Sequence, residues 1–211
     1  RDSWASRGLG DVYKRQPKDQ IIPSEKLEMG SSVKVYVSKL EIGPKGPFIM
    51  LSRSHYGFVK RLLEIEIPEL SDGTIMLYSV ARDAGSRSKI AVYTEYTNVD
   101  PIGAVIGEKG RRIANVLKEL SGEKIDVILY DKDPVKFIAN ALSPAKDVKV
   151  SIKDETKKEA LALVNDKNLS LAIGKKGQNV KLASRLTHYK IEVKPEEQEN
   201  TETTEETSVE E

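Results

Sequence analysis

Apolar and polar residues alternate between positions 32 and 37, which places Val33, Val35 and Val37 on one side of this segment. A period of two is typical of a half-buried β-strand. The turn sequence EIGPKGP follows, and then a second apolar run, FIMLS, at positions 48–52. We therefore predict two or three strands here, either as a small sheet packed on its neighbours or as the remaining half of a larger β domain.

The hydrophobic period becomes helical after position 55. Phe58, Leu62 and Ile65 have the spacing i, i+4, i+7 and predict one helix, which should end before Pro68 because proline disfavours helical backbone in the residue before it. Two further strands are predicted at 73–82 and 87–96, joined by the turn residues at 83–86.

A short apolar helix, a Gly-x-x-Gly loop and an amphipathic helix come next. Asp100-Pro101 supplies a cap and a first-turn proline for the apolar helix at 102–106. The helix after the loop should end at Ser121-Gly122, before a strand at 124–130. Its predicted buried face consists of Ile113, Val116, Leu117 and Leu120.

The same order of elements recurs 67 positions later. The segment AVIGEKGRRIANVL at 104–117 corresponds to LAIGKKGQNVKLAS at 171–184. The second copy is predicted to contain a helix at 135–142 after Asp133-Pro134, strands at 147–152 and 159–164, a helix capped by Asp166, a helix that buries Val180, Ala183 and Leu186, and a strand at 189–194. We predict an α+β fold with two tandem units, each a three-stranded sheet covered by helices.

Composition limits the classes of protein that remain. The chain has 211 residues, of which 38% are hydrophobic and 32% charged, and it has no cysteine. Disulfides, a thiol nucleophile and cysteine-ligated zinc are therefore excluded. No apolar run approaches the roughly 18 residues of a membrane span, and no secretory leader is recognisable. We expect a cytoplasmic monomer without membrane contact.

The net charge of +1 hides a segregation of charge along the chain. The tail at 195–211 has eight glutamates and no basic residue, which leaves 34 basic against 25 acidic residues in positions 1–194. A body with a net charge of +9 favours a polyanionic partner, and the tail has the composition of a disordered appendage, whose simplest role is to aid solubility.

These patterns divide the chain into five segments. Residues 1–16 contain the only tryptophan, show neither period, and are predicted to be a foreign or disordered leader. The others are a partial β domain at 17–54, the first repeated unit with its linking helix at 55–131, the second unit at 132–194 and a disordered acidic tail at 195–211.

The repeated loop has the chemistry of a phosphate-binding site. A helix N-terminus presents unpaired N–H groups and a partial positive charge, and glycines let a sugar-phosphate backbone approach closely. Lys109, Lys175 and Lys176 add mobile positive charge at the same place. The neighbouring groove candidates are Val105, Ile106, Ala172 and Ile173, although Ile106 and Ile173 suit a core position equally well.

A Gly-x-x-Gly loop between two helices, in this order of elements, resembles the K homology (KH) domain in its bacterial arrangement. The tandem, together with the segments ARDAGSRSKIAVYT, NVDPIGAVIGEKG, FIANALSPAK and LSLAIGKKGQN, resembles the NusA family of transcription elongation factors over positions 21–194. In that family an OB-fold precedes the KH pair and a polymerase-docking domain precedes the OB-fold. The resemblance implies that only the last OB strands are present here and that the docking domain is absent.

The resemblance implies binding of single-stranded nascent RNA, with about four nucleotides held by each loop. It also implies RNA polymerase and other elongation or antitermination factors as partners, and a role in pausing, termination and antitermination. Because only Asp131–Asp133 joins the units, we expect a rigid pair that binds one continuous strand. The candidate RNA-binding residues are Ile106, Gly107, Glu108, Lys109, Gly110, Arg111, Arg112, Ile173, Gly174, Lys175, Lys176, Gly177, Gln178 and Asn179.

Other basic residues leave two interpretations open. Arg82, Arg87 and Lys89 form either a solvated rim or a set of phosphate contacts. Ser52-Arg53 is expected to be a surface strand end. The two histidines, His55 and His188, lie far apart in the sequence and have no metal-ligand cluster near them.

An enzyme is not expected. Neither loop has the Gly-x-x-x-x-Gly-Lys-Ser/Thr sequence of an NTPase, and no nucleophile and base can be paired. We predict no catalytic residues, no metal and no cofactor. The alternative function is that of a KH module of the RNA-decay or ribosome-assembly machinery, but the tandem and its order after the β segment favour the elongation factor.

Overall fold

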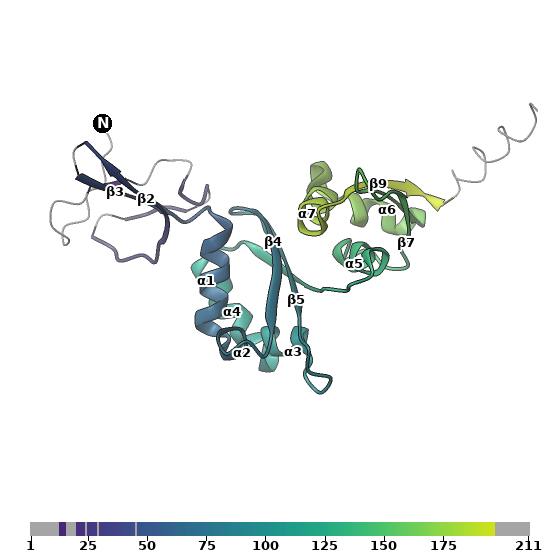
Figure 1. The fold of residues 1–211 in the computed structure, drawn as a ribbon, viewed down its shortest axis with the longest axis horizontal. Coiled ribbons are helices and arrows are strands. Elements are labelled where there is room, and N and C mark those ends of the chain that lie inside the picture. Colours follow the sequence, from purple (N-terminus) through teal and green to yellow (C-terminus); the bar gives the residue numbers. More distant parts are fainter. Residues whose placement is uncertain (1–12, 16–19, 24, 29, 45, 197–211) are drawn as a thin grey trace, which may run out of the picture.

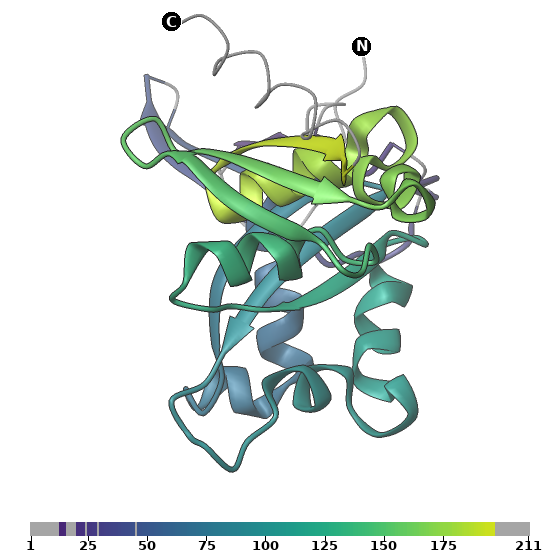
Figure 2. The same cartoon turned by 90° about the vertical axis from the view of Figure 1, so that its right-hand side faces the viewer.

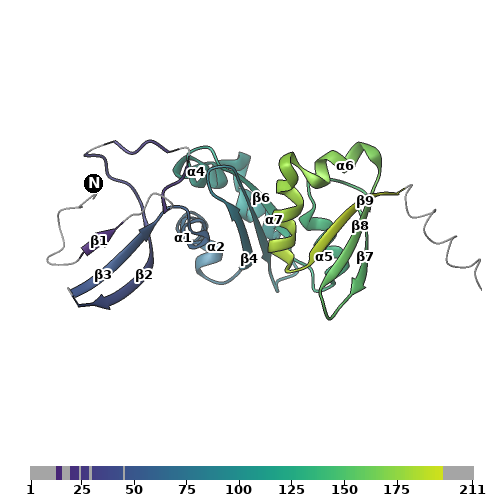
Figure 3. The same cartoon turned by 90° about the horizontal axis from the view of Figure 1, so that it is seen from above.

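The computed structural model describes residues 13–15, 20–23, 25–28, 30–44 and 46–196. Three three-stranded sheets follow one another along the long axis of the molecule, as Figure 1 and Figure 3 show. A β segment comes first and two units of helices and sheet follow, so the predicted fold class is confirmed. In the part of the chain that is described, no helix is long and apolar enough to cross a membrane.

The first sheet has the strand order β1-β3-β2. β2 (Tyr36–Gly43) pairs antiparallel with β3 (Gly46–Ser52), and β1 (Tyr13–Arg15) pairs in parallel with β3. β1 lies within the segment that was predicted to stay outside the fold. A three-residue strand is too short to show a period, and its pairing with β3 defines it. The rest of that predicted leader, and positions 197–211 of the predicted tail, lie outside the described residues.

The predicted strand at 32–37 begins later than expected, because residues 31–35 are irregular. Val33, Val35 and Val37, which were expected on a buried face, are 40%, 36% and 54% exposed. The alternation is real, but among the described residues no second sheet covers this face. Val33 and Val35 thus lie outside the strand, and the more buried residue is Tyr36, which was predicted on the opposite face.

The first repeated unit contains the predicted helices and strands. Its helices are α1 (Tyr56–Glu66), α2 (Pro68–Ser71), α3 (Pro101–Ile106) and α4 (Arg111–Glu119), and its strands are β4 (Met76–Asp83), β5 (Arg87–Tyr93) and β6 (Lys124–Leu129). β5 lies between antiparallel β4 and parallel β6. The side chain of Asp100 accepts a hydrogen bond from the Ile102 backbone N–H at 3.0 Å, which confirms the predicted cap of α3.

Helix α1 is present as predicted, with two of the three residues that predicted it buried. Phe58 and Leu62 are buried, but Ile65 is 67% exposed. Val59 and Leu63 are buried in its place, because α4 and β4 contact α1 on the side of these residues. One hydrophobic residue at helical spacing thus lies on the solvent face.

The second unit repeats the first. It consists of α5 (Pro134–Ala141), β7 (Lys149–Asp154), β8 (Glu159–Val164), α6 (Asp166–Ile173), α7 (Gln178–Thr187) and β9 (Lys190–Pro195). β8 lies between antiparallel β7 and parallel β9, as β5 does between β4 and β6. The predicted cap Asp166 is the first residue of α6. The cap is Asn165, whose side chain accepts from the Asn168 backbone N–H at 3.0 Å.

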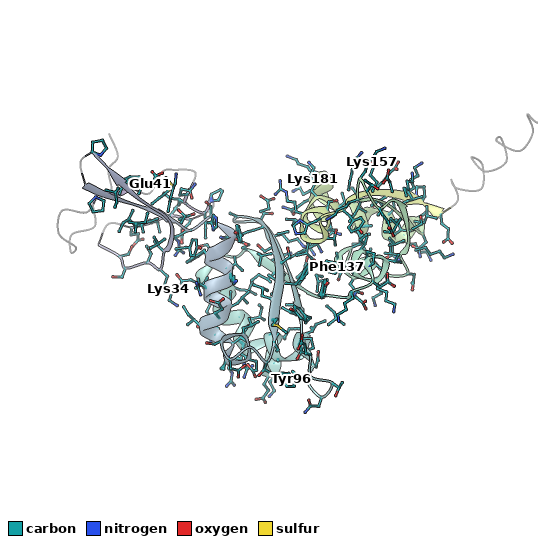
Figure 4. The ribbon with its side chains drawn as sticks, in the orientation of Figure 1. Lys34, Glu41, Tyr96, Phe137, Lys157 and Lys181 are labelled. Atoms are coloured by element: carbon teal, nitrogen blue, oxygen red, sulfur yellow. The ribbon has the colours of Figure 1, made fainter. Side chains whose placement is uncertain are left out.

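One hydrophobic cluster extends across both units, and the first unit also has a cluster of its own that includes Val59, Leu63 and Ile90. Helix α7 lies against β4 and β5, and α5 lies beside β6. Ala91 and Ile128 of the first sheet are buried in the same cluster as Phe137, Leu182 and Leu186 of the second unit. Figure 2 shows the second unit lying across the upper part of the first. Figure 4 shows Phe137 of α5 on the side of this helix that faces the first sheet. Common burial of this kind favours a rigid pair.

Buried arginines join the β segment to the first unit. The Arg53 side chain is 2% exposed and donates from Nε and Nη2 to Glu25 at 2.7 and 2.5 Å. It also donates to the Glu119 carbonyl at 2.9 Å, across the boundary with α4. Arg53 and the fully buried Ser52 are therefore not a surface strand end. A guanidinium is stable inside the protein only because several acceptors surround it.

Candidate nucleic-acid interface

The two Gly-x-x-Gly loops have the same backbone conformation. Each begins with a glycine that has positive φ and extended ψ and continues with a short 3-10 turn, η2 (Glu108–Gly110) in the first unit and η3 (Lys175–Gly177) in the second. The φ and ψ angles of the first glycine are 73° and 173° at Gly107 and 74° and 172° at Gly174. Those of the lysine before the second glycine are 53° and 27° at Lys109 and 54° and 28° at Lys176. Those of the second glycine are 73° and 15° at Gly110 and 73° and 17° at Gly177.

Both loops end at an uncapped helix N-terminus. Gly110 and Gly177 are the N-cap residues of α4 and α7, and no side chain makes a cap hydrogen bond there. The first N–H of each helix, that of Arg111 or of Gln178, donates to the carbonyl of Glu108 or of Lys175. The helix dipole adds a partial positive charge at this end. An anionic oxygen is the natural acceptor at such a position.

The first glycine of each loop allows close packing beneath the loop. A Cβ on Gly107 would lie 2.6 Å from Arg112 Cγ, and one on Gly174 would lie 2.7 Å from Asn179 Cβ. A Cβ on Gly110 would meet nothing within 4 Å, and one on Gly177 only Lys181 Cε at 3.8 Å. The second glycine therefore faces open space, on the side from which a ligand can approach.

The charged side chains at the centre of the loops point into solvent. Glu108, Lys109, Lys175 and Lys176 are exposed, as is Arg111 at the start of α4. Within the described ranges, Lys109, Lys175 and Lys176 form no ion pair with an acidic side chain. Loop two carries two lysines where loop one carries a glutamate and a lysine, so loop two has the higher positive charge.

The apolar groove candidates divide into core and surface. Val105 and Ala172 have no exposed area and belong to the core, so they cannot line a groove. Ile106 is 37% exposed and Ile173 is half-buried, which leaves both next to the loop surface. Leu171, 47% exposed on α6, also lies here and was not singled out from the sequence.

The second residue after each loop holds the loop from below. Arg112 Nη1 donates to the Ala104 carbonyl at 2.9 Å and to Glu69 on α2 at 2.8 Å. In the second unit Asn179 is 1% exposed, and its Nδ2 lies 2.9 Å from the Ala172 carbonyl and 3.1 Å from those of Leu171 and Leu142. The structure thus places Asn179 beneath loop two, out of reach of a ligand on the surface.

Gln178 is directed toward the first unit. Its Nε2 donates to Asp83 Oδ2 at 2.6 Å, at the end of β4, and to Ser86 Oγ at 2.7 Å, in the turn before β5. Arg111, at the corresponding position after loop one, makes no such bridge among the described residues. The two loops therefore have the same backbone conformation and differ in the residues that surround them.

Arg82, Arg87 and Lys89 do not lie on a common rim. The Arg82 side chain is 2% exposed and donates to buried Glu123 at 2.9 Å. Lys89 has no exposed area and donates to Asp126 at 3.1 Å and to the Ser143 carbonyl at 2.7 Å. Arg82 and Lys89 are therefore neither a solvated rim nor a set of accessible phosphate contacts, the two interpretations that the sequence left open. Arg87 is 25% exposed and pairs with Asp126 at 2.7 Å.

Burial also changes the acidity of Lys89. It lowers the pKa of the Lys89 ammonium below its usual range, although the neighbouring Asp126 carboxylate acts in the opposite direction. The residue occupies the boundary between the two units, and no alternation or motif in the sequence marks it as buried.

A groove runs along the boundary of the two units. Its volume is about 680 Å³, and it is open to solvent between α3, β6 and the segment that follows α5. Ile102 and Leu129 line it from the first unit, and Asn140, Lys146 and Val148 line it from the second. Sequence reasoning missed Asn140 and Lys146, because only the packing of the units brings them beside Ile102.

No metal site accompanies these loops in the portion that the structure describes, where no group of three or more histidine or acidic side chains is arranged to hold an ion. The arrangement offers backbone donors, mobile lysines and an adjoining apolar groove. Those groups suit binding of a phosphate backbone with its bases, and they include no assembled nucleophile and base.

Two helix-loop-helix elements with this geometry, each beside a three-stranded sheet, define a tandem KH-domain protein. A family model described as the NusA-like first KH domain matches residues 53–130, and one described as the NusA-like second KH domain matches residues 134–201. The chain belongs to the NusA family.

Several curated relatives are similar to this chain over most of its length. Identity is 50% over 188 residues with the transcription termination/antitermination protein NusA of Halalkalibacterium halodurans, covering 89% of this chain and 49% of that protein. It is 48% over 188 residues with the protein of the same name from Bacillus subtilis, covering 89% and 50%. With that of Thermus thermophilus it is 46% over 184 residues, covering 87% and 47%. The chain spans about half the length of these curated relatives.

Proposed function

We propose that the chain binds one continuous strand of single-stranded RNA across both loops. The observation that carries this proposal is the repetition of one phosphate-binding backbone geometry, with unpaired lysines, on two units that share a core. About four nucleotides for each loop give a strand of at least eight. Because the units are fixed together, the second loop binds at a high effective concentration once the first is occupied.

The groove at the boundary supports a path between the loops. Ile102 lies on α3, directly before loop one, and Lys146 lies next to α6, which precedes loop two. We propose that bases pass along the apolar side of this groove and that Lys146 contacts a phosphate. Single strands are favoured over duplexes, since bases must be unpaired to enter it.

Loop two is proposed to bind phosphate more strongly than loop one. Lys175 and Lys176 lie at its centre, and Lys181 is exposed one turn further along α7. In loop one, Glu108 offsets the charge of Lys109. The difference is electrostatic, so it should decrease as salt is added.

We infer a role in transcription from the names of the relatives, which are termination and antitermination proteins. RNA polymerase and other elongation factors are the proposed partners, and nascent transcript is the proposed RNA. We further propose that the chain acts as a cytoplasmic monomer that binds RNA without catalysing a reaction on it. The names of the relatives favour this function over RNA decay or ribosome assembly.

Fluorescence anisotropy with a labelled 12-nucleotide RNA, single-stranded and as a duplex, tests the proposal. We expect Lys175→Asp/Lys176→Asp to weaken single-strand binding by roughly tenfold or more at low salt. The slope of log affinity against log salt should fall by about 1.4, or about 0.7 for each phosphate that is no longer neutralised. Lys109→Asp should have a smaller effect.

Lys157→Asp/Lys158→Asp provides a matched control. Lys157 and Lys158 are adjacent and exposed, and Lys158 has the φ of Lys176, 53° against 54°. The Lys158 carbonyl accepts from the Lys190 N–H beyond the C-terminus of α7, so about 15 Å of helix separates this turn from loop two. Figure 4 shows Lys157 and Lys181 apart on the second unit. Equal losses in both variants would mean that net charge, not the loop, binds RNA.

A further inference from the structure

The two loops are supported by different parts of the molecule. Loop one rests on its own unit, since Arg112 beneath it is held by Glu69 on α2 and by the Ala104 carbonyl on α3. Loop two is followed by Gln178, whose amide donates to Asp83 and Ser86 of the first unit. Asn179 supports loop two within its own unit, and the Gln178 contacts add a support that crosses the boundary between units.

The turn that receives Gln178 is itself held in place. Gly85 at its tip donates its backbone N–H to Glu123 at 3.0 Å, and buried Arg82 donates to the same carboxylate. The Ser86 carbonyl accepts from the Lys124 N–H at 3.1 Å, which ties the turn to β6. Asp83 Oδ2 and Ser86 Oγ are thus acceptors in fixed positions, although both residues are exposed.

A second connection reaches loop two from below. Asn179 donates to the carbonyl of Leu142 at the C-terminal end of α5, and the next carbonyl, that of Ser143, accepts from buried Lys89 of β5. Asn179 Oδ1 is a buried side-chain atom without a hydrogen-bond partner. Asn179 is therefore held through Nδ2 alone, between the end of α5 and the carbonyls of Leu171 and Ala172 on α6.

We propose that the turn between β4 and β5 positions loop two for RNA, with Asp83 and Ser86 as positioning residues that act through Gln178. Loop two then depends on the first unit for its RNA-binding conformation, whereas loop one does not depend on the second unit. This inference rests on the proposed function, because it concerns how the same RNA site is assembled.

The sign of a charge effect separates positioning from simple electrostatics. Asp83 is a negative charge beside a loop that binds a polyanion, so its removal alone should raise RNA affinity. If removal of Asp83 instead lowers RNA affinity, the change is opposite to the electrostatic expectation. The hydrogen bonds to Gln178 must then contribute to RNA binding. Asp83 and Ser86 are exposed turn residues, so their replacement leaves the core intact.

The test is a set of variants of the full chain, measured by anisotropy with the 12-nucleotide single strand. Asp83→Ala/Ser86→Ala is expected to weaken binding by roughly threefold to tenfold, the effect of losing two hydrogen bonds. The loss caused by Asp83→Ala/Ser86→Ala should persist when these substitutions are combined with Lys109→Asp. It should disappear when they are combined with Lys175→Asp/Lys176→Asp, because loop two of that variant no longer binds RNA. Glu95→Ala/Thr97→Ala, at the opposite end of β5, is the matched control and should not weaken binding. Unchanged or stronger binding of the turn variant, or an equal loss in the loop-two background, would overturn the inference.

Amide hydrogen exchange separates failure of this inference from failure of the proposed function. In the turn variant without RNA, exchange should accelerate at residues 174–177 and stay constant at 107–110. If the unsubstituted chain binds no RNA, the proposed function fails, while this measurement still decides whether the turn positions the loop. Equal exchange in both loops would reject positioning even if RNA binds.

Discussion

At the scale of single residues, the two glycines of each loop meet different physical requirements. Gly174 has φ 74° and ψ 172°, a backbone region open essentially to glycine alone, and it also lies against Asn179. Gly177 has φ 73° and ψ 17°, which is the left-handed region that asparagine tolerates, and it faces open space. The motif thus combines one structural glycine with one that keeps the surface clear.

Asparagine at each position should separate these requirements. We expect Gly174→Asn to lower the free energy of unfolding by about 3 kcal/mol, because strained backbone and a steric clash add together. Gly177→Asn should cost about 1 kcal/mol. Urea denaturation followed by circular dichroism measures both values. Equal losses of unfolding free energy in the two variants would contradict the different roles of Gly174 and Gly177.

His55 should make stability depend on pH. Its Nδ1 accepts from the Gly57 N–H at 3.0 Å as the cap of α1, and its ring stacks on Tyr36 with centroids 5.1 Å apart. Burial, with Arg82 nearby, holds the pKa of His55 below its ordinary 6.5. Below pH 6.5 the unfolded chain therefore binds more protons than the folded chain. The contribution of His55 should be complete above pH 6.5 and decrease as the pH falls toward the folded-state pKa.

His55→Asn is the control for this titration, because an asparagine cap accepts the same hydrogen bond and does not ionise. Urea denaturation between pH 7.5 and 5 should show a steeper loss of stability for the unsubstituted chain than for His55→Asn. Parallel curves for the two proteins would show that His55 does not contribute.

At the scale of elements, a buried cluster of arginines fastens the β segment to the first unit, beside Ile22, which is buried in the core of that unit. Arg53 connects Glu25 before β2 with the end of α4, and Arg82 on β4 donates to the Arg53 carbonyl at 2.7 Å. Phe58 of α1 lies beneath both guanidinium groups, 4.9 Å from Arg53 and 5.8 Å from Arg82. Removal of one partner from such a cluster leaves the others buried and unpaired.

Arg53→Met should therefore detach the β segment. We expect a loss of about 3 kcal/mol from the unpaired Glu25, and a smaller loss for Arg53→Lys, which keeps the charge without the two parallel hydrogen bonds. Hydrogen exchange should accelerate most in β2 and β3 and least in β8. Uniform acceleration through β8 would mean that the β segment is part of one cooperative core.

At the scale of the whole molecule, a hydrophobic cluster that spans the boundary joins the two KH units, and we expect them to unfold together. Ala91 of β5 has no exposed area and lies in the cluster that contains Leu182 and Leu186 of α7. Separation of the units would expose these apolar surfaces to water, which is unfavourable. The RNA path proposed above requires that this arrangement persists in solution.

Ala91→Asp should disrupt that arrangement. A buried carboxylate without a partner costs several kcal/mol, on the order of 3 or more, so we expect one thermal transition for the unsubstituted chain and two for the variant. Ser151→Asp, at an exposed position of β7, is the matched control and should keep one transition. Differential scanning calorimetry distinguishes the outcomes. Two transitions in the unsubstituted chain would show that the units do not depend on each other, and a single transition in Ala91→Asp would show that this substitution does not disrupt their arrangement.

The sequence by itself determined the local structure: the repeated order of elements, the cap of α3 at Asp100, and the two loops with their exposed lysines. These features depend on residues close together in the chain, where periodicity and glycine chemistry act directly. The loop residues were therefore found without knowledge of the fold, although their contact with RNA stays a prediction.

Only the tertiary structure decided which charged residues are buried and what they hold. Arg53, Arg82 and Lys89 look like surface residues in the sequence, because their partners lie 19 or more positions away. The bridge from Gln178 to Asp83 spans 95 positions, and the groove lined by Ile102 and Lys146 exists only where the units meet. A buried charge is stable only when distant acceptors converge on it, and that convergence is a property of the packed molecule, which local sequence patterns do not encode.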